Sequence, residues 1–163
     1  SLAEKRTLQA IQFNIQESIR SALELIQYEL RHRQIEVKIE SQTKFMVVYA
    51  DRVQIEQVLA NLFINALEAM AESSYPRKLT INVSSAEDSM ILVAITDTGN
   101  GVPEDFVDHL FTPFTTNKKD GLGIGLSLSR SLVEAAGGRI YYRSTSERGA
   151  CFHLLLPTRP CRK

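Results

Sequence analysis

The sequence predicts an α+β fold with two layers, in which a mixed, mainly antiparallel sheet is covered on one face by three helices. Three helical patterns of apolar residues are interspersed with short runs in which apolar and polar residues alternate, as in half-buried strands. The last helical pattern is followed by two strand-like runs around "SERG", and this closing hairpin disfavours a doubly wound parallel sheet. With 163 residues, of which 44% are hydrophobic, the chain is large enough for one domain with a single core.

The N-terminal third predicts a strand, a helix and two further extended segments. "LQAIQF" is typical of a short strand, and Asn14 then serves as a helix N-cap with Glu17 three residues later, as in a capping box. Apolar residues recur at helical spacing as far as Leu30, so we expect a helix from about 15 to 33. "IEVKIE" predicts a half-buried strand, and "FMVVYA" a short strand or extended connection.

The rest of the chain predicts two more helices and four strands. Asp51 precedes the longest helical pattern, which ends before "SSYPRK". "LTINVSS" and "MILVAITD" predict paired strands joined around "AEDS". After an irregular stretch, a third helix is expected over 126–136, where two glycines stop it. "RIYYRST" and "ACFHLLLP" then form the closing hairpin.

Charge and cysteine content exclude several classes of function. Nineteen basic and nineteen acidic side chains cancel, so no overall charge attracts nucleic acid or an anionic membrane. No apolar run approaches the length of a membrane span. We therefore expect no nucleic-acid partner and no membrane contact by this domain. Cys151 and Cys161 form neither a disulfide framework nor a metal site, and we expect reduced thiols.

Two asparagines stand four residues apart in the apolar helical segment "NLFINALEAM". Asn61 and Asn65 therefore project from one face of the second helix. Buried amides need partners, so each could satisfy the backbone of a neighbouring loop. An amide oxygen could equally ligate a hard cation, with the helix face as the floor of a nucleotide pocket. The residues alone leave both interpretations open.

A carboxylate followed by two glycines ends the strand "ILVAIT". In "DTGNGVP", Gly99 and Gly101 allow the backbone to turn sharply beside Asp97. A carboxylate accepts hydrogen bonds, which suits an exocyclic amine such as that of adenine. An ordinary Asp-Gly turn explains the same residues, and for an isolated motif it is the better interpretation.

The stretch "NKKDGLGIGLSLSR" places Gly121, Gly123 and Gly125 at alternate positions just before a helix. Glycine costs backbone entropy and supplies no side chain to bury, so a close approach to the backbone explains them better than packing does. The N-terminal amides of the following helix can bind a phosphate. The spacing fits neither a dinucleotide-binding fold, where a strand comes directly before the glycines, nor a Walker P-loop, where Lys-Ser or Lys-Thr follows them.

In order and spacing, five segments resemble the motifs of the catalytic domain of sensor histidine kinases. They are "NLFINALEAM", "DTGNGVP", "LFTPFTT", "GLGIGL" and "GACFHLLLP", and the match runs from about Asn14 to Pro157. This domain has the Bergerat fold of the GHKL ATPase superfamily, which includes DNA gyrase and MutL. The run "TTNKKDGLGIGLSLSRSLVEAAGG" is most similar to the nitrogen- and oxygen-sensing kinase branch, which has a short ATP lid.

The resemblance implies ATP and Mg²⁺ as ligands and a role for each motif. Asn65 matches the magnesium ligand, Asn61 its companion one turn earlier, and Asp97 the carboxylate that reads adenine. Residues 115–122 would form the lid, in which Lys118 would contact the terminal phosphates. The residues expected to act in catalysis are thus Asn61, Asn65 and Lys118. The residues expected to bind the nucleotide are Asn61, Asn65, Asp97, Gly99, Gly101, Val102, Phe114, Thr115, Thr116, Lys118, Gly121, Leu122, Gly123, Ile124, Gly125 and Leu126.

Asn61 also separates subfamilies, because the gyrase branch has at this position a glutamate that activates water. An amide cannot take a proton at neutral pH, so the resemblance implies transfer of the γ-phosphoryl group to a protein, with slow hydrolysis at most. The alternatives are a GHKL serine kinase of the anti-sigma-factor type and a non-catalytic nucleotide-binding module. Two departures from the family pattern keep the latter open: Glu68 stands where many members have a basic residue, and Cys151 where members often have threonine.

None of the three histidines has the sequence context of the phosphoacceptor. The family's acceptor is followed by an acidic residue and soon by a proline, unlike His32, His109 and His153. We therefore expect the acceptor on a separate helical hairpin, and expect this chain to bind ATP without phosphorylating itself. The expected division is 1–7 as a remnant of that hairpin or a linker, 8–158 as the catalytic domain and 159–163 as a tail.

The resemblance also implies the partners of this domain. They are ATP and ADP, the histidine-bearing hairpin of the same kinase and, indirectly, the receiver domain of a response regulator. The expected location is the cytoplasm, as the soluble domain of a sensor.

Overall fold

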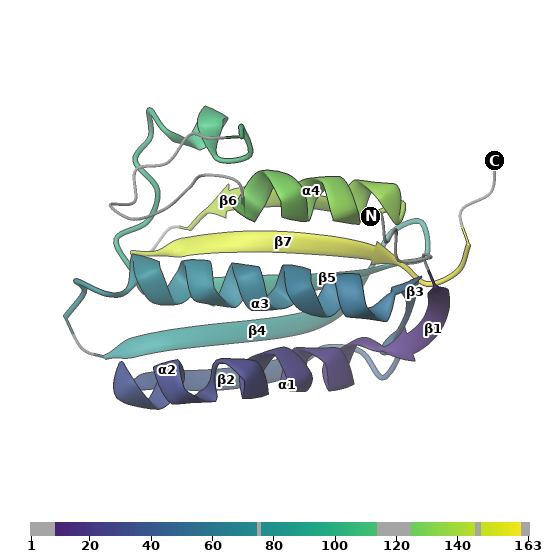
Figure 1. Cartoon of the computed structure of the whole chain (residues 1–163), viewed down its shortest axis with the longest axis horizontal. Helices are drawn as coiled ribbons and strands as arrows, with labels where there is room; N and C mark the ends of the chain where they lie inside the picture. Colours follow the sequence, from purple (N-terminus) through teal and green to yellow (C-terminus); the bar gives the residue numbers. More distant parts are fainter. Residues whose placement is uncertain (1–8, 75, 114–124, 146–147, 161–163) are drawn as a thin grey trace, which may run out of the picture.

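One sheet with helices over one face makes up most of the molecule, as Figure 1 shows. The computed structural model describes residues 9–74, 76–113, 125–145 and 148–160. The helices are α1 (Ile15–Leu25), α2 (Gln27–His32), α3 (Arg52–Ala69) and α4 (Gly125–Ala135), with a 3₁₀ turn at Val107–His109. The strands are β1 (Ala10–Asn14), β2 (Ile35–Ser41), β3 (Val47–Asp51), β4 (Arg77–Ala86), β5 (Met90–Asp97), β6 (Arg139–Ser144) and β7 (Ala150–Pro157).

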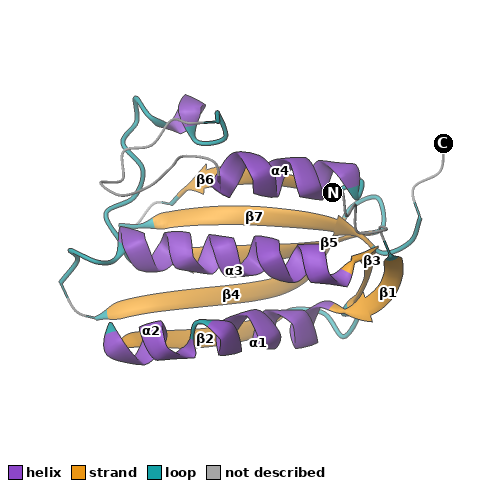
Figure 2. Ribbon diagram, viewed as in Figure 1, coloured by secondary structure: helices purple, strands orange, loops and turns teal. Residues whose placement is uncertain are grey.

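The main sheet has five strands in the order β2-β4-β5-β7-β6 (Figure 2). Only β2 and β4 run parallel; the other neighbours are antiparallel, and β4-β5 and β6-β7 are the two expected pairs. A separate antiparallel pair, β1-β3, lies at one end and leads into α1 and α3. The prediction of a two-layer, mainly antiparallel α+β fold is confirmed.

The core lies between the helices and the sheet. Its largest fully buried side chains come from both layers, among them Phe63 and Leu59 of α3, Ile81 of β4, Ile95 of β5 and Leu154 of β7. Central strands β4 and β5 alternate buried and half-buried positions, so one face of the sheet packs against the helices. No helix within the described part of the chain is both long and apolar enough to cross a membrane.

The expected single helix over 15–33 is wrong, because the chain breaks at Ile26 and forms two helices. Ile26 has φ −108° and ψ 17°, and its amide donates to the Leu23 carbonyl at 3.2 Å, one residue short of the α-helical partner. The break keeps Ile26 buried while Leu25 and Tyr28 are exposed. In the described part of the chain, four helices therefore cover the sheet instead of the three expected.

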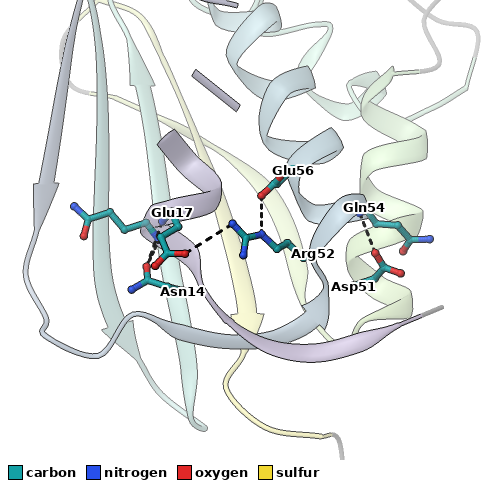
Figure 3. A network of polar contacts seen from close by, with 7 residues as sticks. Asn14, Glu17, Asp51, Arg52, Gln54 and Glu56 are labelled. Carbon is teal, nitrogen blue, oxygen red and sulfur yellow. Dashed lines mark hydrogen bonds and ion pairs between the residues drawn. The ribbon is translucent and has the colours of Figure 1, made fainter. Parts of the chain in front are cut away.

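Two helix N-termini are capped by the last residues of β1 and β3 (Figure 3). The Asn14 side-chain oxygen accepts from the amides of residues 16 and 17, at 2.8 and 3.2 Å, as predicted. The Glu17 carboxylate does not complete a capping box; it lies 3.8 Å from Arg52, which also pairs with Glu56 at 3.0 Å. Asp51 caps α3 by accepting from the Gln54 amide at 3.2 Å.

Candidate functional site

The two asparagines of α3 lie on the side of the helix that meets the start of α4. The Asn61 amide nitrogen donates to the hydroxyl of Ser129, a residue of α4 that is only 3% exposed, at 3.0 Å. A Cβ atom at Gly125, the first residue of α4, would lie 2.8 Å from the Asn61 amide oxygen. A side chain at this position would displace the Asn61 amide, so glycine allows α4 to begin directly against Asn61, with Asn65 one turn further along α3.

The N-terminus of α4 lies beside these asparagines. The first four N–H groups of a helix have no intrahelical acceptor, and the helix dipole makes this end attractive to anions. Gly125 and the half-buried Leu126 are the described members of the glycine-rich motif. The other expected residues of that motif and lid lie outside the described residues: Phe114, Thr115, Thr116, Lys118, Gly121, Leu122, Gly123 and Ile124.

Asp97 is a buried carboxylate at the end of β5. Its side chain is 3% exposed and accepts from the Gly99 amide at 2.8 Å, with a second backbone hydrogen bond from Ala150. Desolvation raises the pKa of Asp97 from 3.8 to about 6, although both backbone hydrogen bonds act in the opposite direction. Within the described residues no basic side chain forms an ion pair with it.

The turn after Asp97 is packed so tightly that its glycines are needed. A Cβ at Gly99 would overlap the carbonyl oxygen of Ala69, the last residue of α3. Gly101 has φ +77°, a left-handed conformation in which side chains are strained. Gly149, before β7, has φ +122°, and a Cβ there would overlap the Asp97 carbonyl. These contacts hold Asp97, the residue expected to bind adenine, between the end of α3 and the start of β7.

Helix α3 joins the two halves of the site. Asn61, Asn65 and Ala69 follow each other at intervals of four residues, so they lie along roughly one face over about 12 Å. The Asn61 end touches the α4 N-terminus, and the Ala69 end touches the turn after Asp97. The arrangement offers a hydrogen-bond acceptor at one end and anion-binding amides at the other, with amide oxygens suited to a hard cation between them.

Sequence reasoning missed two residues that shape this site. Ser129 holds Asn61, and its spacing of four residues from Gly125 along one helix face could have indicated it. Gly149 lies inside a motif segment, but its contact with Asp97 depends on the pairing of distant strands. The Arg148 side chain also donates to the side chain of Asn100, between the two glycines of the turn.

Cys151 and Glu68, the two departures from the family pattern, differ in burial. Cys151 is buried, and its sulfur accepts a hydrogen bond from the Thr96 hydroxyl at 3.3 Å, so the neighbouring strand supplies a threonine at this place. Glu68 is exposed on α3. All three histidines have aromatic contacts: His32 stacks on Tyr28, the His109 ring lies 6.4 Å from that of Phe106, and the His153 ring nitrogen lies 3.3 Å from the Tyr141 hydroxyl.

The sequence and the fold are similar to those of known proteins. Residues 50–160 match the family model described as histidine kinase-, DNA gyrase B- and HSP90-like ATPase. The chain is 51% identical over 111 residues to sensor protein FixL of Bradyrhizobium diazoefficiens, covering 68% of this chain and 22% of FixL. It is 32% identical over 157 residues to sensor histidine kinase ZraS of Escherichia coli K12, covering 96% of this chain and 32% of ZraS.

Solved structures agree with the sequence relatives. The catalytic domain of histidine kinase ThkA, in a nucleotide-free form, superposes with a TM-score of 0.82 at 32% identity, covering 92% of this chain and 96% of that one. Our chain spans only about an eighth to a third of the length of the first curated relatives. The chain therefore belongs to the histidine kinase-, DNA gyrase B- and HSP90-like ATPase family, and within it to the ATP-binding catalytic domains of sensor histidine kinases.

Proposed function

We propose that the domain binds ATP with Mg²⁺ along α3 and transfers the γ-phosphoryl group to a histidine on a separate helical hairpin of the same kinase. The main support for this proposal is the environment of Asp97. Its carboxylate is nearly buried and accepts hydrogen bonds from two backbone amides, and it has no ion-pair partner in the described residues. An uncompensated buried charge is costly, and such costs are typical of functional sites. Its remaining acceptor capacity suits the exocyclic amine of adenine.

The residues at the other end fit a magnesium-bound polyphosphate. Asn65 would hold the metal through its amide oxygen, and Asn61 is held by Ser129 beside the N-terminus of α4. When bound, Mg²⁺ would neutralise charge on the phosphate oxygens. The α4 amides would bind phosphate oxygens, and we propose that Lys118 and the glycines before α4 add further contacts.

The amide at position 61 supports phosphoryl transfer over hydrolysis. Asn61 donates to Ser129 and has no carboxylate that could take a proton from water. The protein's own contribution is therefore positioning and neutralisation of charge, as in other phosphoryl transfers. We place the acceptor histidine outside residues 8–158, on a hairpin to which 1–7 would lead, with 159–163 as a tail. A response regulator receiver domain would take the phosphoryl group in turn, on the cytoplasmic side where ATP is available.

Calorimetric titration with ATP and with GTP, with and without Mg²⁺, tests the site. We expect Asp97→Asn to abolish most discrimination for adenine, and Asn65→Ala to remove mainly the contribution of the metal. Asp105→Asn and Gln27→Ala are matched controls, because both side chains are exposed and Gln27 lies on α2, not on the face of α3 that carries Asn61 and Asn65. If Asp97→Asn and Asn65→Ala bind like the wild type, the assignment of the site is wrong.

A second experiment tests the reaction. Mixing the domain with ATP and a separately expressed histidine hairpin should yield acid-labile phosphate on the hairpin, and Asn65→Ala should abolish it. Acid-stable phosphate would indicate a serine kinase instead. Nucleotide binding without transfer to any hairpin would indicate a non-catalytic module.

A further inference from the structure

A groove on the far side of α4 from Asn61 and Asn65 is lined by α4 and the edge strand β6. Its volume is about 600 Å³, and its walls include Arg130 and Glu134 of α4 and Arg139, Tyr141 and Arg143 of β6. β6 is the last strand of the sheet, so one side of its backbone has no partner strand within the described residues (Figure 1). An unpaired edge is a ready template for another strand.

The groove carries more positive charge than its own acid can neutralise. Glu134 pairs with Arg130 at 3.1 Å. In the described part of the chain no carboxylate lies within ion-pair distance of Arg139 or Arg143; Arg143 instead lies over the Tyr141 ring, 5.4 Å from its centroid. Two exposed arginines on one short edge strand therefore remain available to an anionic partner.

The opposite edge of the same sheet is built differently. Strand β2 alternates acidic and basic side chains, and Lys38 pairs with Glu40 at 3.6 Å while Glu36 pairs with Lys78 at 3.8 Å. Such a self-neutralised edge discourages pairing with another chain. The contrast shows that the excess positive charge is a property of the β6 edge and not of the sheet as a whole.

We propose that the β6 edge binds an acidic polypeptide segment in extended conformation, which adds to the sheet as a further strand. The backbone of β6 would supply main-chain hydrogen bonds, and Arg139 and Arg143 would set the register. Ile140 and Tyr142 pack into the core, so Arg139, Tyr141 and Arg143 share the other face of the strand. The two arginines are four residues apart, or about 13 Å, which matches carboxylates at positions i and i+4 of the segment.

Register makes this proposal testable with two peptides of identical composition. One is a labelled peptide of about nine residues with glutamates at i and i+4 and β-branched residues between them. The other moves one glutamate to i+3, which places it on the opposite face of the added strand. By fluorescence anisotropy we expect the first peptide to bind roughly three- to tenfold more tightly. N-methylation of alternate peptide amides should abolish binding, because main-chain pairing is lost.

Variants of the domain provide the second arm. Arg139→Gln/Arg143→Gln should weaken binding of the first peptide to the level of the second, while Arg20→Gln/Arg31→Gln removes the same charge from exposed helical positions and should have little effect. Bound peptide should slow hydrogen exchange at β6 amides. The ATP affinity of the variants should not change, so a failure of this proposal can be distinguished from a failure of the kinase proposal. Equal affinity for both peptides, no binding, or preference for single-stranded DNA or anionic vesicles would overturn the proposal.

Discussion

Replacing Asp97 by Asn removes a buried carboxylate whose negative charge lowers the stability of the folded protein. The pKa of Asp97 is raised from 3.8 to about 6 in the folded protein, so the folded state binds the proton more tightly than the unfolded state does. Stability is then highest below the unfolded pKa and falls as pH rises towards 6. The difference of about 2.2 pKa units corresponds to about 3 kcal/mol over the whole window. Between about pH 5 and pH 8 the carboxyl accounts for roughly 1.4 kcal/mol of that loss.

Urea unfolding at these two pH values measures the effect directly. Asparagine has one acceptor oxygen fewer and should lose one backbone hydrogen bond, but that cost of about 1–3 kcal/mol applies at both pH values. The free energy of unfolding of Asp97→Asn relative to wild type should therefore rise by roughly 1.4 kcal/mol from about pH 5 to pH 8. The exposed Asp105→Asn serves as control for loss of a surface carboxylate. A difference between Asp97→Asn and wild type that is the same at both pH values would refute the reasoning.

Three further predictions follow from the same contacts. ATP affinity should fall roughly tenfold between about pH 7 and pH 5, measured by calorimetry, because protonation of Asp97 removes the acceptor; a flat profile would contradict this. Ser129→Ala should cost about 1 kcal/mol of stability in urea unfolding and weaken Mg²⁺-ATP binding, since Asn61 loses its partner, whereas the exposed Ser131→Ala should change neither. Arg77→Met should lower stability by about 2 kcal/mol, because the guanidinium donates to two backbone carbonyls just after α3 and to one at the C-terminal end of α2; unchanged thermal melting would disprove this.

Local signals in the sequence predicted local structure well. Asn14 and Asp51 were identified as helix starts because a cap depends only on residues within the next turn. Alternating runs predicted the strands, and the two pairs joined by short connections, β4-β5 and β6-β7, were predicted with them. The break at Ile26 was missed because apolar spacing continues through it, and a single non-helical residue does not change the pattern.

Contacts between distant segments could not be predicted in the same way. The parallel pairing of β2 with β4 requires a crossover that includes β3 and α3, and no local residue encodes it. Asn61 and Asp97 were identified from motif spacing. Their partners Ser129 and Ala150 come from tertiary packing of α4 and β7. The roles of both residues in nucleotide binding stay predictions.

Helix α3 is in contact with both ends of the site. The rotation of one end about the helix axis relative to the other is therefore fixed, as well as the distance between them. One residue inserted between Asn65 and Ala69 would turn one end relative to the other by about 100° and move it about 1.5 Å along the axis. A change in the turn between β4 and β5 would leave that relation intact, since the turn lies at the other end of β5 from Asp97. Evolution and engineering of this domain should therefore accept insertions at residues 87–89 far more readily than within this stretch of α3.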